Sequence, residues 1–266
     1  MMKAMRSIQR NDEATDSVVG RAMTILTAFG PADTVVGLAE LTRRTRLPKA
    51  TVHRLLGELT AWAAVERTEG GYRLGMRLFE LGQLAPRQRG LREAALPLLS
   101  DLYEATHETV HLGVLDGLQV VYVEKLAGRG GPALASRVGG RMPAHCTGLG
   151  KAMLAFSPPS VLHDVVAAGL TRLTARTIVM PGILERELTT VRTRGVAFEH
   201  EESTPGVVCA ACPVLGPDGT ALAAISVAGW ADRLDTARLA PAVRTAALGL
   251  SRQLGGGPSA QVSRTR

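Results

Sequence analysis

Cysteine, aromatic residues and long apolar runs are all scarce in this sequence. The 266 residues include only Cys146, Cys209 and Cys212, and aromatic residues make up 3% of them. So few thiols, odd in number, do not build the disulfide framework of a small secreted domain, and they are typical of a reducing compartment. No run approaches the roughly 20 apolar residues that cross a bilayer, and no apolar core follows the basic residues near the N-terminus. We therefore expect a cytoplasmic protein without a membrane partner.

Catalytic signatures are missing too. The sequence contains no HExxH metalloprotease motif, no nucleophile elbow and no phosphate-binding loop. His107 and His111 are four residues apart, but the alternation of apolar residues around His111 indicates a strand, not a helix that would present both on one face. We interpret these histidines and His163 as surface or packing residues, and the acidic pair at 201–202 as a solvated charge run. The sequence therefore predicts no enzyme activity, no cofactor and no metal ion.

What the sequence does contain is a pair of short helical segments within residues 38–59, followed by a hairpin pattern at 65–74. Bulky apolar residues of the second segment recur at the spacing of one helix face: Val52, Leu55, Leu56 and Leu59. Pro48 suits the first helical position, where no amide donor is needed. Another amphipathic segment, residues 19–29, precedes the pair. This layout predicts a winged helix-turn-helix domain over residues 15–75.

A local cluster of cations supports double-stranded DNA as the partner of that domain. The formal charge of +7 is spread over the whole chain, whereas residues 41–57 carry several cations and no acidic residue. Cations neutralise phosphates, and small polar side chains on the second helix reach base edges in the major groove. We predict base contacts from Thr51 and Arg54 and phosphate contacts from Lys49, Arg67 and Arg73. The full predicted set is Arg43, Arg44, Lys49, Thr51, His53, Arg54, Arg67, Tyr72 and Arg73. The alternative interpretation is that this basic helix pair is only a solvent-exposed surface packed on a core and does not bind DNA.

The remaining pattern predicts a second, α+β domain. Helical segments are expected at 91–106, 148–156, 159–168, 183–194 and 233–253. Strands are expected at 109–115 and 118–126, around the Asp116-Gly117 turn, and at 207–215 and 220–228. Consecutive antiparallel strands between helices indicate an antiparallel sheet with flanking helices. The predicted organisation is a disordered arm at 1–14, the winged helix at 15–75, a helical linker at 76–90, this domain at 91–254 and a flexible tail at 255–266.

Four ordered motifs resemble those of the IclR-type bacterial transcriptional regulators, and the resemblance covers about residues 16–253. They lie at 47–56 (LPKATVHRLL), 91–99 (LREAALPLL), 141–155 (RMPAHCTGLGKAMLA), and 205–209 (PGVVC) with 224–229 (AISVAG). The resemblance implies a promoter-binding regulator whose second domain, GAF-like in fold, holds a small metabolite effector, usually a carboxylate. It also implies a homodimer or a dimer of dimers, since one reading helix recognises only a few base pairs. The linker at 76–90 would carry the effector's influence to the DNA-binding domain.

The resemblance also implies which residues hold the effector. Backbone amides of residues 147–150 would bind its carboxylate, although the glycines there could equally serve tight packing. The family's pocket positions correspond to Leu134, Met142, Gly148, Leu149, Glu199, Cys209, Ser226 and Ala228. Family members commonly have Asp in place of Glu199 and often Ser in place of Ala228, so the ligand should differ from that of some relatives. Arg46 replaces a usual Gly between the two helices, which predicts a left-handed backbone there.

A metal- or thiol-sensing regulator is the alternative function. Cys209 and Cys212 have C-x-x-C spacing, and His145, Cys146 and His200 are near the same pocket by resemblance or in sequence. In an alternating strand, however, the side chains of residues 209 and 212 lie on opposite faces. A shared ion is therefore disfavoured.

Overall fold

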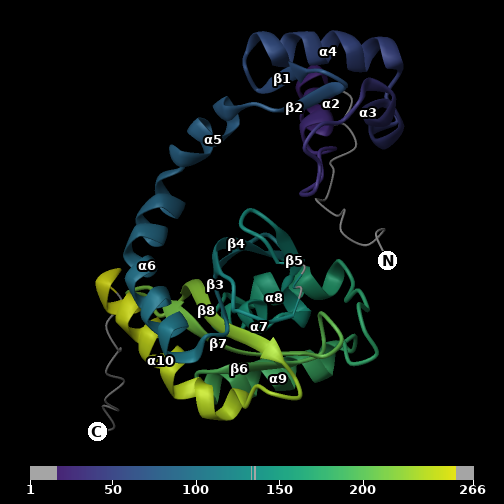
Figure 1. The fold of residues 1–266 in the computed structure, drawn as a ribbon. Helices are drawn as coiled ribbons and strands as arrows, with labels where there is room; N and C mark the ends of the chain where they lie inside the picture. The colour runs from purple at the N-terminus through teal and green to yellow at the C-terminus, as the bar shows by residue number, and fades with distance from the viewer. Residues whose placement is uncertain (1–16, 133, 135, 256–266) are drawn as a thin grey trace, which may run out of the picture. The chain divides into compact units, whose positions relative to one another are not determined.

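The computed structural model describes residues 17–132, 134 and 136–255 (Figure 1). The chain divides into two compact units, residues 1–89 and 90–266, which are described separately below. The arm predicted at 1–14 lies outside the described residues, and so does the predicted tail except for Gly255.

The first unit is a small helical domain with a two-stranded wing. Its elements are α2 (Val18–Leu26), α3 (Leu38–Thr45), α4 (Lys49–Ala61), β1 (Val65–Thr68), β2 (Gly71–Leu74) and α5 (Met76–Gln83). Ser17 caps α2 by accepting the N–H of Gly20 at 2.9 Å. The core contains Ile25, Leu41, Val52, Leu55, Leu56, Val65 and Tyr72. The apolar stripe predicted on the second helix is therefore the side of α4 that packs inward, with Leu59 partly buried at its end.

The turn between α3 and α4 has the backbone predicted from its sequence. Arg46 has φ 59° and ψ 19°, the left-handed conformation, and its N–H donates to the carbonyl oxygen of Thr42 at 3.0 Å. A non-glycine residue in this region costs about 1 kcal/mol, which the surrounding helices must offset. Pro48 is the residue just before α4, so it lies one position earlier than predicted.

The predicted linker is not a single helix. α5 ends at Gln83, and Pro86 begins α6 (Pro86–Thr106), which joins the end of the predicted linker at 76–90 to the helix predicted at 91–106. Proline is well placed at a helix start because it has no amide hydrogen to leave unbonded. The boundary between the two compact units therefore lies within the first turns of α6.

The second unit is built on an antiparallel sheet of six strands in the order β5-β4-β3-β8-β7-β6. The strands are β3 (Thr109–Asp116), β4 (Gln119–Leu126), β5 (Arg141–Pro143), β6 (Ala197–His200), β7 (Val207–Leu215) and β8 (Ala221–Trp230). The four long strands agree with the predicted ones to within a few residues. The two short edge strands, β5 and β6, were not predicted.

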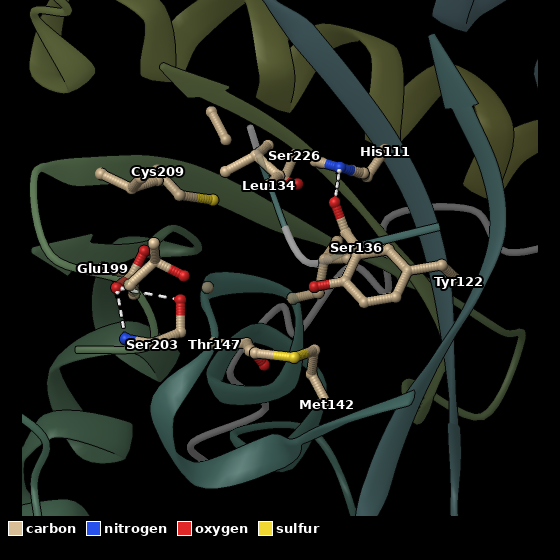
Figure 2. Close-up of a pocket in the computed structure, with 15 residues that line it drawn as sticks. His111, Tyr122, Leu134, Ser136, Met142, Thr147, Glu199, Ser203, Cys209 and Ser226 are labelled. Carbon is tan, nitrogen blue, oxygen red and sulfur yellow. Dashed lines mark hydrogen bonds between the residues drawn. The ribbon is translucent and has the colours of Figure 1, made fainter. Parts of the chain in front are cut away.

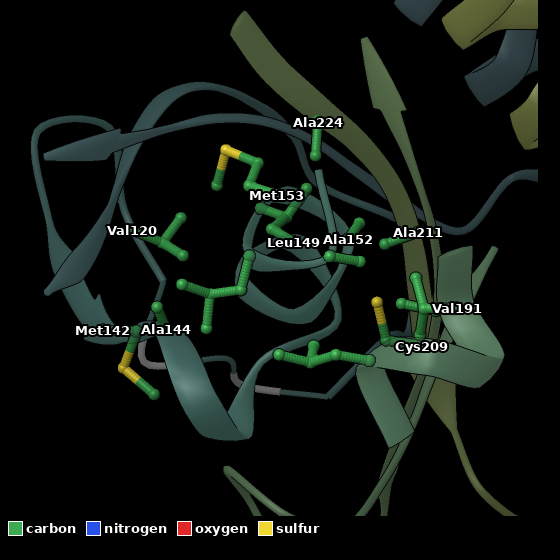
Figure 3. Packing of buried hydrophobic residues seen from close by; sticks show 14 of the residues in the cluster. Val120, Met142, Ala144, Leu149, Ala152, Met153, Val191, Cys209, Ala211 and Ala224 are labelled. Atoms are coloured by element: carbon green, nitrogen blue, oxygen red, sulfur yellow. The ribbon is translucent and has the colours of Figure 1, made fainter. Parts of the chain in front are cut away.

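Helices cover both faces of this sheet, which confirms the α+β class. α7 (Gly148–Leu154), α8 (Pro159–Ala167) and α9 (Pro181–Arg194) contribute to one buried cluster, around Leu149, Met153 and Val191 (Figure 3). α6 and α10 (Thr236–Gln253) pack on the opposite face, around Leu99, Ile225 and Leu250. A short 3₁₀ turn, Ala144–Cys146, precedes α7. A Cβ on Gly150 would lie 2.1 Å from the carbonyl oxygen of Ala144, so only glycine permits this approach.

Candidate functional site

One surface of α4 carries exposed polar and cationic side chains. Lys49, His53 and Arg54 are exposed and Thr51 is partly exposed, while the apolar stripe of the same helix is buried. In the wing, Arg67 and Arg73 are exposed as well. The first unit therefore presents most of the predicted DNA-binding residues to solvent on α4 and on the wing.

Several of these arginines pair with acids of their own unit. Arg54 pairs with Glu58 one turn further along α4, and Arg73 pairs with Glu66 across the wing at 2.6 Å. Both arginines remain more than half exposed. Lys49 and Arg67 have no acidic partner in the part of the chain that the structure describes. Exposed pairs of this kind are weak and exchange readily for phosphates.

Arg44 has a structural role that its sequence position did not reveal. Its guanidinium pairs with Asp33 and, at 2.6 Å, with Glu40, and it also donates to the carbonyl oxygen of Ala28 at 3.0 Å. The Arg44 side chain is 22% exposed, against 74% for its neighbour Arg43. The hydrogen bond from Arg44 also lowers the pKa of Asp33. Arg44 therefore ties α3 to the preceding loop, and we no longer assign it to DNA.

Tyr72 was wrongly predicted to face DNA. It is 8% exposed and belongs to the core of the first unit. Its backbone N–H donates to the carbonyl oxygen of Val36 at 3.0 Å, and its own carbonyl accepts from Val36 at 2.8 Å. This bridge joins the wing to the segment before α3. The alternation in β2 places Tyr72 on the inner face and Arg73 on the outer one.

In the second unit, a pocket lies between the sheet and the start of α7 (Figure 2). Its volume is about 40 Å³. The eight residues that the family resemblance pointed to all line it: Leu134, Met142, Gly148, Leu149, Glu199, Cys209, Ser226 and Ala228. Thr147, from the predicted carboxylate-binding segment 147–150, lines it too, whereas sequence reasoning missed six further lining residues: His111, Tyr122, Ser136, Ser203, Thr204 and Val207. The structure thus brings the predicted residues together, while their role in ligand binding stays a prediction.

Strand register explains why residues distant in sequence meet here. Glu199 is opposite Cys209, and Cys209 is opposite Ala228, so three strands form one row on the sheet. In the next row Ser226 is opposite His111. Residues in register across neighbouring strands share a face. The floor of the pocket is therefore set by the pairing of β6, β7, β8 and β3.

Glu199 forms the acidic end of the pocket. Its Oε1 accepts the N–H groups of Glu202 at 2.6 Å and Ser203 at 3.0 Å, and the residue is 2% exposed. Burial raises the pKa of Glu199 to about 7, and the nearby Glu202 carboxylate adds to this effect. The two N–H donors and the charge of Lys151 only partly oppose it. The carboxyl group therefore changes protonation state close to neutral pH.

The other end of the pocket is polar and uncharged. His111 Nε2 and Ser136 Oγ are 2.8 Å apart, and the ring of Tyr122 lies edge-on to the imidazole with centroids 5.1 Å apart. Burial, together with the charge of Lys125, lowers the pKa of His111 to about 3. The imidazole is therefore neutral at physiological pH. The interpretation of His111 as a surface or packing residue missed its position at the pocket wall.

The start of α7 forms the side of the pocket opposite the sheet. Thr147 caps the helix by accepting the N–H of Gly150 at 3.2 Å, which leaves Gly148 and Leu149 as the amides that could bind a ligand. A Cβ on Gly148 would lie 2.7 Å from Cys209 Sγ. Packing therefore requires glycine at position 150, where a Cβ would meet backbone, whereas a Cβ at position 148 would have to displace the Cys209 thiol.

Behind Glu199 lies a buried charge cluster that the sequence did not predict. Lys151 is 1% exposed, and its Nζ donates to Glu202 Oε1 at 2.5 Å and to Glu187 Oε1 at 3.1 Å. Glu202 is 6% exposed, and its Oε2 has no hydrogen-bond partner among the described residues. The interpretation of residues 201–202 as a solvated charge run is therefore wrong for Glu202.

The positions of Cys209 and Cys212 agree with the prediction that the two thiols lie on opposite faces of a strand, which disfavours a shared metal ion. Cys209 belongs to the cluster on the α7 face of the sheet and Cys212 to the cluster on the α10 face. His145 and Cys146 do not line the pocket, and burial raises the pKa of the Cys212 thiol to about 12. Within residues 17–132, 134 and 136–255, no three His, Cys, Asp or Glu side chains are arranged to hold a metal.

Two family models together match most of the chain. The family model for the IclR helix-turn-helix domain matches residues 18–69, and that for the bacterial transcriptional regulator IclR C-terminal region matches residues 84–252. The chain therefore belongs to the IclR family of transcriptional regulators. It is a DNA-binding regulator with a C-terminal effector domain, and its relatives are named as regulators, not as enzymes.

Individual relatives are similar over almost their whole length. The HTH-type transcriptional regulator XynR of Escherichia coli is 34% identical over 243 residues, which are 89% of this chain and 96% of XynR. BhcR of Paracoccus denitrificans is 34% identical, with coverage of 88% and 84% respectively. An IclR homologue from Microbacterium hydrocarbonoxydans, crystallised with 4-hydroxybenzoate, has a TM-score of 0.83 and 28% identity. That comparison covers 91% of this chain and all of the homologue.

No helix within the described residues combines the length and the apolar character that a bilayer crossing requires.

Proposed function

We propose that this protein controls transcription through a small carboxylic acid that binds in the pocket of the second unit and changes the affinity of the first unit for promoter DNA. The arrangement that carries the proposal is the pocket itself. Gly148 and Leu149, at the start of α7, line it together with the sheet residues Glu199, Ser226 and His111. The 4-hydroxybenzoate bound by the Microbacterium homologue supports a ligand with a carboxylate and a hydroxyl group.

The small volume of the pocket supports a coupled mechanism. About 40 Å³ accommodates only a few water molecules. We infer that an acid separates the walls as it enters, so that it binds one arrangement of the second unit better than another. Such differential binding is what allows a ligand to shift a conformational equilibrium. We infer that the shift reaches the winged helix through α5 and α6, the helices that join the two regions in sequence.

On DNA, we propose that α4 reads the major groove. Thr51 and Arg54 would contact bases, while Lys49, His53 and Arg43 and the wing residues Arg67 and Arg73 would contact phosphates or sugars. The exposure of these side chains supports this assignment. A homodimer, or a dimer of dimers, would supply the half-sites that one short helix cannot read alone.

The proposal is tested in two steps. First, DNA fragments from the source genome are selected by binding to the purified protein, which should enrich promoter fragments over bulk competitor. Second, a panel of small aromatic and aliphatic acids, including 4-hydroxybenzoate and lactate, is screened for stabilisation of the protein on heating. Enrichment of no fragment would contradict the regulator's proposed mode of action, and stabilisation by neutral compounds alone would contradict the ligand class.

A further inference from the structure

The described lining of the pocket contains a carboxyl group but no lysine or arginine to balance the charge of an acidic ligand. Among its fifteen described lining residues, none is lysine or arginine, and Glu199 is the single carboxyl group. The nearest cations are engaged elsewhere. Lys151 binds Glu202 and Glu187, and Lys125 donates to the carbonyl oxygen of Ser136 at 2.7 Å. A carboxylate in this pocket would therefore meet two amides of α7 on one side and the Glu199 carboxyl on the other.

Glu199 cannot turn away from such a ligand. Its Oε1 accepts from the amides of Glu202 and Ser203, of which the contact to Ser203 is drawn in Figure 2. The side chain is also buried, with the residue 2% exposed. Two like charges in an enclosed site repel strongly because water does not screen them. When Glu199 carries a proton, the repulsion disappears and the carboxyl group becomes a hydrogen-bond donor to the ligand.

We propose that this pocket admits a carboxylate ligand only together with one proton, which is held by Glu199. The inference rests on the proposed function, because it specifies how an acid is recognised at that site. The ligand enters as the anion, the proton comes from solvent, and no covalent bond forms or breaks. Glu199 thereby sets the ligand class, since at high pH the pocket accepts neutral molecules and discriminates against acids.

The groups around Glu199 make it the one that titrates in the neutral range. From β4 and β7, Tyr122 and Cys209 face it, and both have pKa values raised by burial. The Cys146 thiol, before α7, has its pKa raised to about 12. Lys151 of α7 stays paired with Glu202, and His111 of β3 is neutral throughout. The raised pKa of Glu199, about 7, supports a proton exchange that occurs under physiological conditions.

The experiment measures ligand affinity as a function of pH with matched acids and amides. The probes are 4-hydroxybenzoate with 4-hydroxybenzamide, and lactate with lactamide, titrated calorimetrically into the full-length protein. With Glu199 titrating near 7, acid affinity should fall about 30-fold from pH 6.0 to pH 8.5, whereas amide affinity should stay constant. At pH 8.5, comparison of two buffers with different ionisation enthalpies should show the uptake of about one proton per bound acid.

The variant Glu199→Gln identifies the group responsible. A glutamine amide keeps the acceptor oxygen for the two backbone N–H groups and resembles the protonated acid. Acid affinity should then be independent of pH and, at pH 8.5, tighter than in the wild type. Ser226→Ala, which removes a pocket hydroxyl that does not titrate, should keep the wild-type pH slope. If Glu199→Gln does not fold, the acid and amide profiles of the wild type still decide the matter.

The outcomes separate this inference from the proposed function. A flat profile for a bound acid in the wild type, or an unchanged slope in Glu199→Gln, overturns the proton requirement while leaving acid recognition intact. Failure of both acids to bind at every pH, with amide binding retained, overturns the ligand class and the inference with it.

Discussion

Lys151 and Glu202 form an ion pair inside the second unit, with Nζ 2.5 Å from Oε1 and both side chains less than 10% exposed. The pair stands directly behind the pocket, because the N–H of Glu202 also binds Glu199 at 2.6 Å. Burial raises the pKa of Glu202, and the adjacent ammonium opposes that rise. Glu202 therefore connects the buried ion pair to the pocket, because it binds both Lys151 and Glu199.

Removal of the ammonium should destabilise the fold strongly. Lys151→Met leaves Glu202 buried without its partner, which typically costs about 3–5 kcal/mol. The double variant Lys151→Met, Glu202→Gln should recover part of this loss, since the carboxylate that remains without its partner, Glu187, is partly exposed. Denaturant unfolding measures both. The exposed pair of Arg141 and Asp116 supplies the control: Arg141→Ala should leave the midpoint unchanged, and an equal loss for both single variants would contradict the account.

The pH dependence of stability should carry the signature of Glu199. Its pKa is raised to about 7 in the folded state, so between about pH 4.5 and 7 the folded protein keeps a proton that the unfolded chain releases. The unfolding free energy therefore falls as pH rises through this window and levels off above it. Glu199→Gln should gain about 2–3 kcal/mol relative to the wild type between pH 5 and pH 8.

The matched control for that experiment is Glu185→Gln, because Glu185 is exposed on α9. The stability of this variant gives the effect of replacing an exposed carboxyl group, which is subtracted. If the remaining difference for Glu199→Gln is constant with pH, Glu199 titrates alike in the folded and unfolded chain.

Two adjacent arginines of α3 should behave differently. Arg44→Ala breaks the contacts to Asp33, Glu40 and Ala28, and should lower the stability of the first unit by about 1–2 kcal/mol. Arg43→Ala should leave stability unchanged and reduce the salt dependence of DNA binding by about one unit of slope. Thermal unfolding and salt titrations separate the two effects, and a reversed pattern would show that their roles had been exchanged.

On α4, we likewise distinguish a proposed base contact, Arg54, from a proposed phosphate contact, Lys49. Arg54→Ala should relax the preference at one operator position, at a cost of about 1–3 kcal/mol for the preferred base. Lys49→Ala should weaken binding to all sequences alike. Competition between operator and random DNA measures both, and an equal loss on the two DNAs for Arg54→Ala would refute its assignment as a base reader.

Much of the fold followed from local patterns. Three features could be predicted because each depends only on the residues of its own element. They are the apolar stripe of α4, the Asp116-Gly117 turn and the alternation in β7. β6 was missed because four residues without a flanking turn signal give too little periodicity. β6 depends on its pairing with β7, and that pairing arises from the tertiary structure and not from local sequence.

Part of the site could be found from the sequence only through resemblance. Strand alternation places His111 on the face opposite to Val110 and Leu112, so its position beside the pocket was available in principle. The enclosure of Lys151 was not, because a lysine in a helix is ordinarily exposed and its partners are 36 and 51 residues away. Tyr72 was wrongly assigned to the DNA-binding surface because its hairpin is rich in polar residues. Strand alternation places its side chain on the inward face.

The central claim is that a small acid in the pocket and promoter DNA influence each other's binding. The most direct measurement is the affinity of the stabilising acid for the protein with and without saturating operator, paired with operator affinity with and without the acid. The account predicts that both ratios are equal and lie between about 5 and 150. Identical acid affinities in the presence and absence of operator would contradict it.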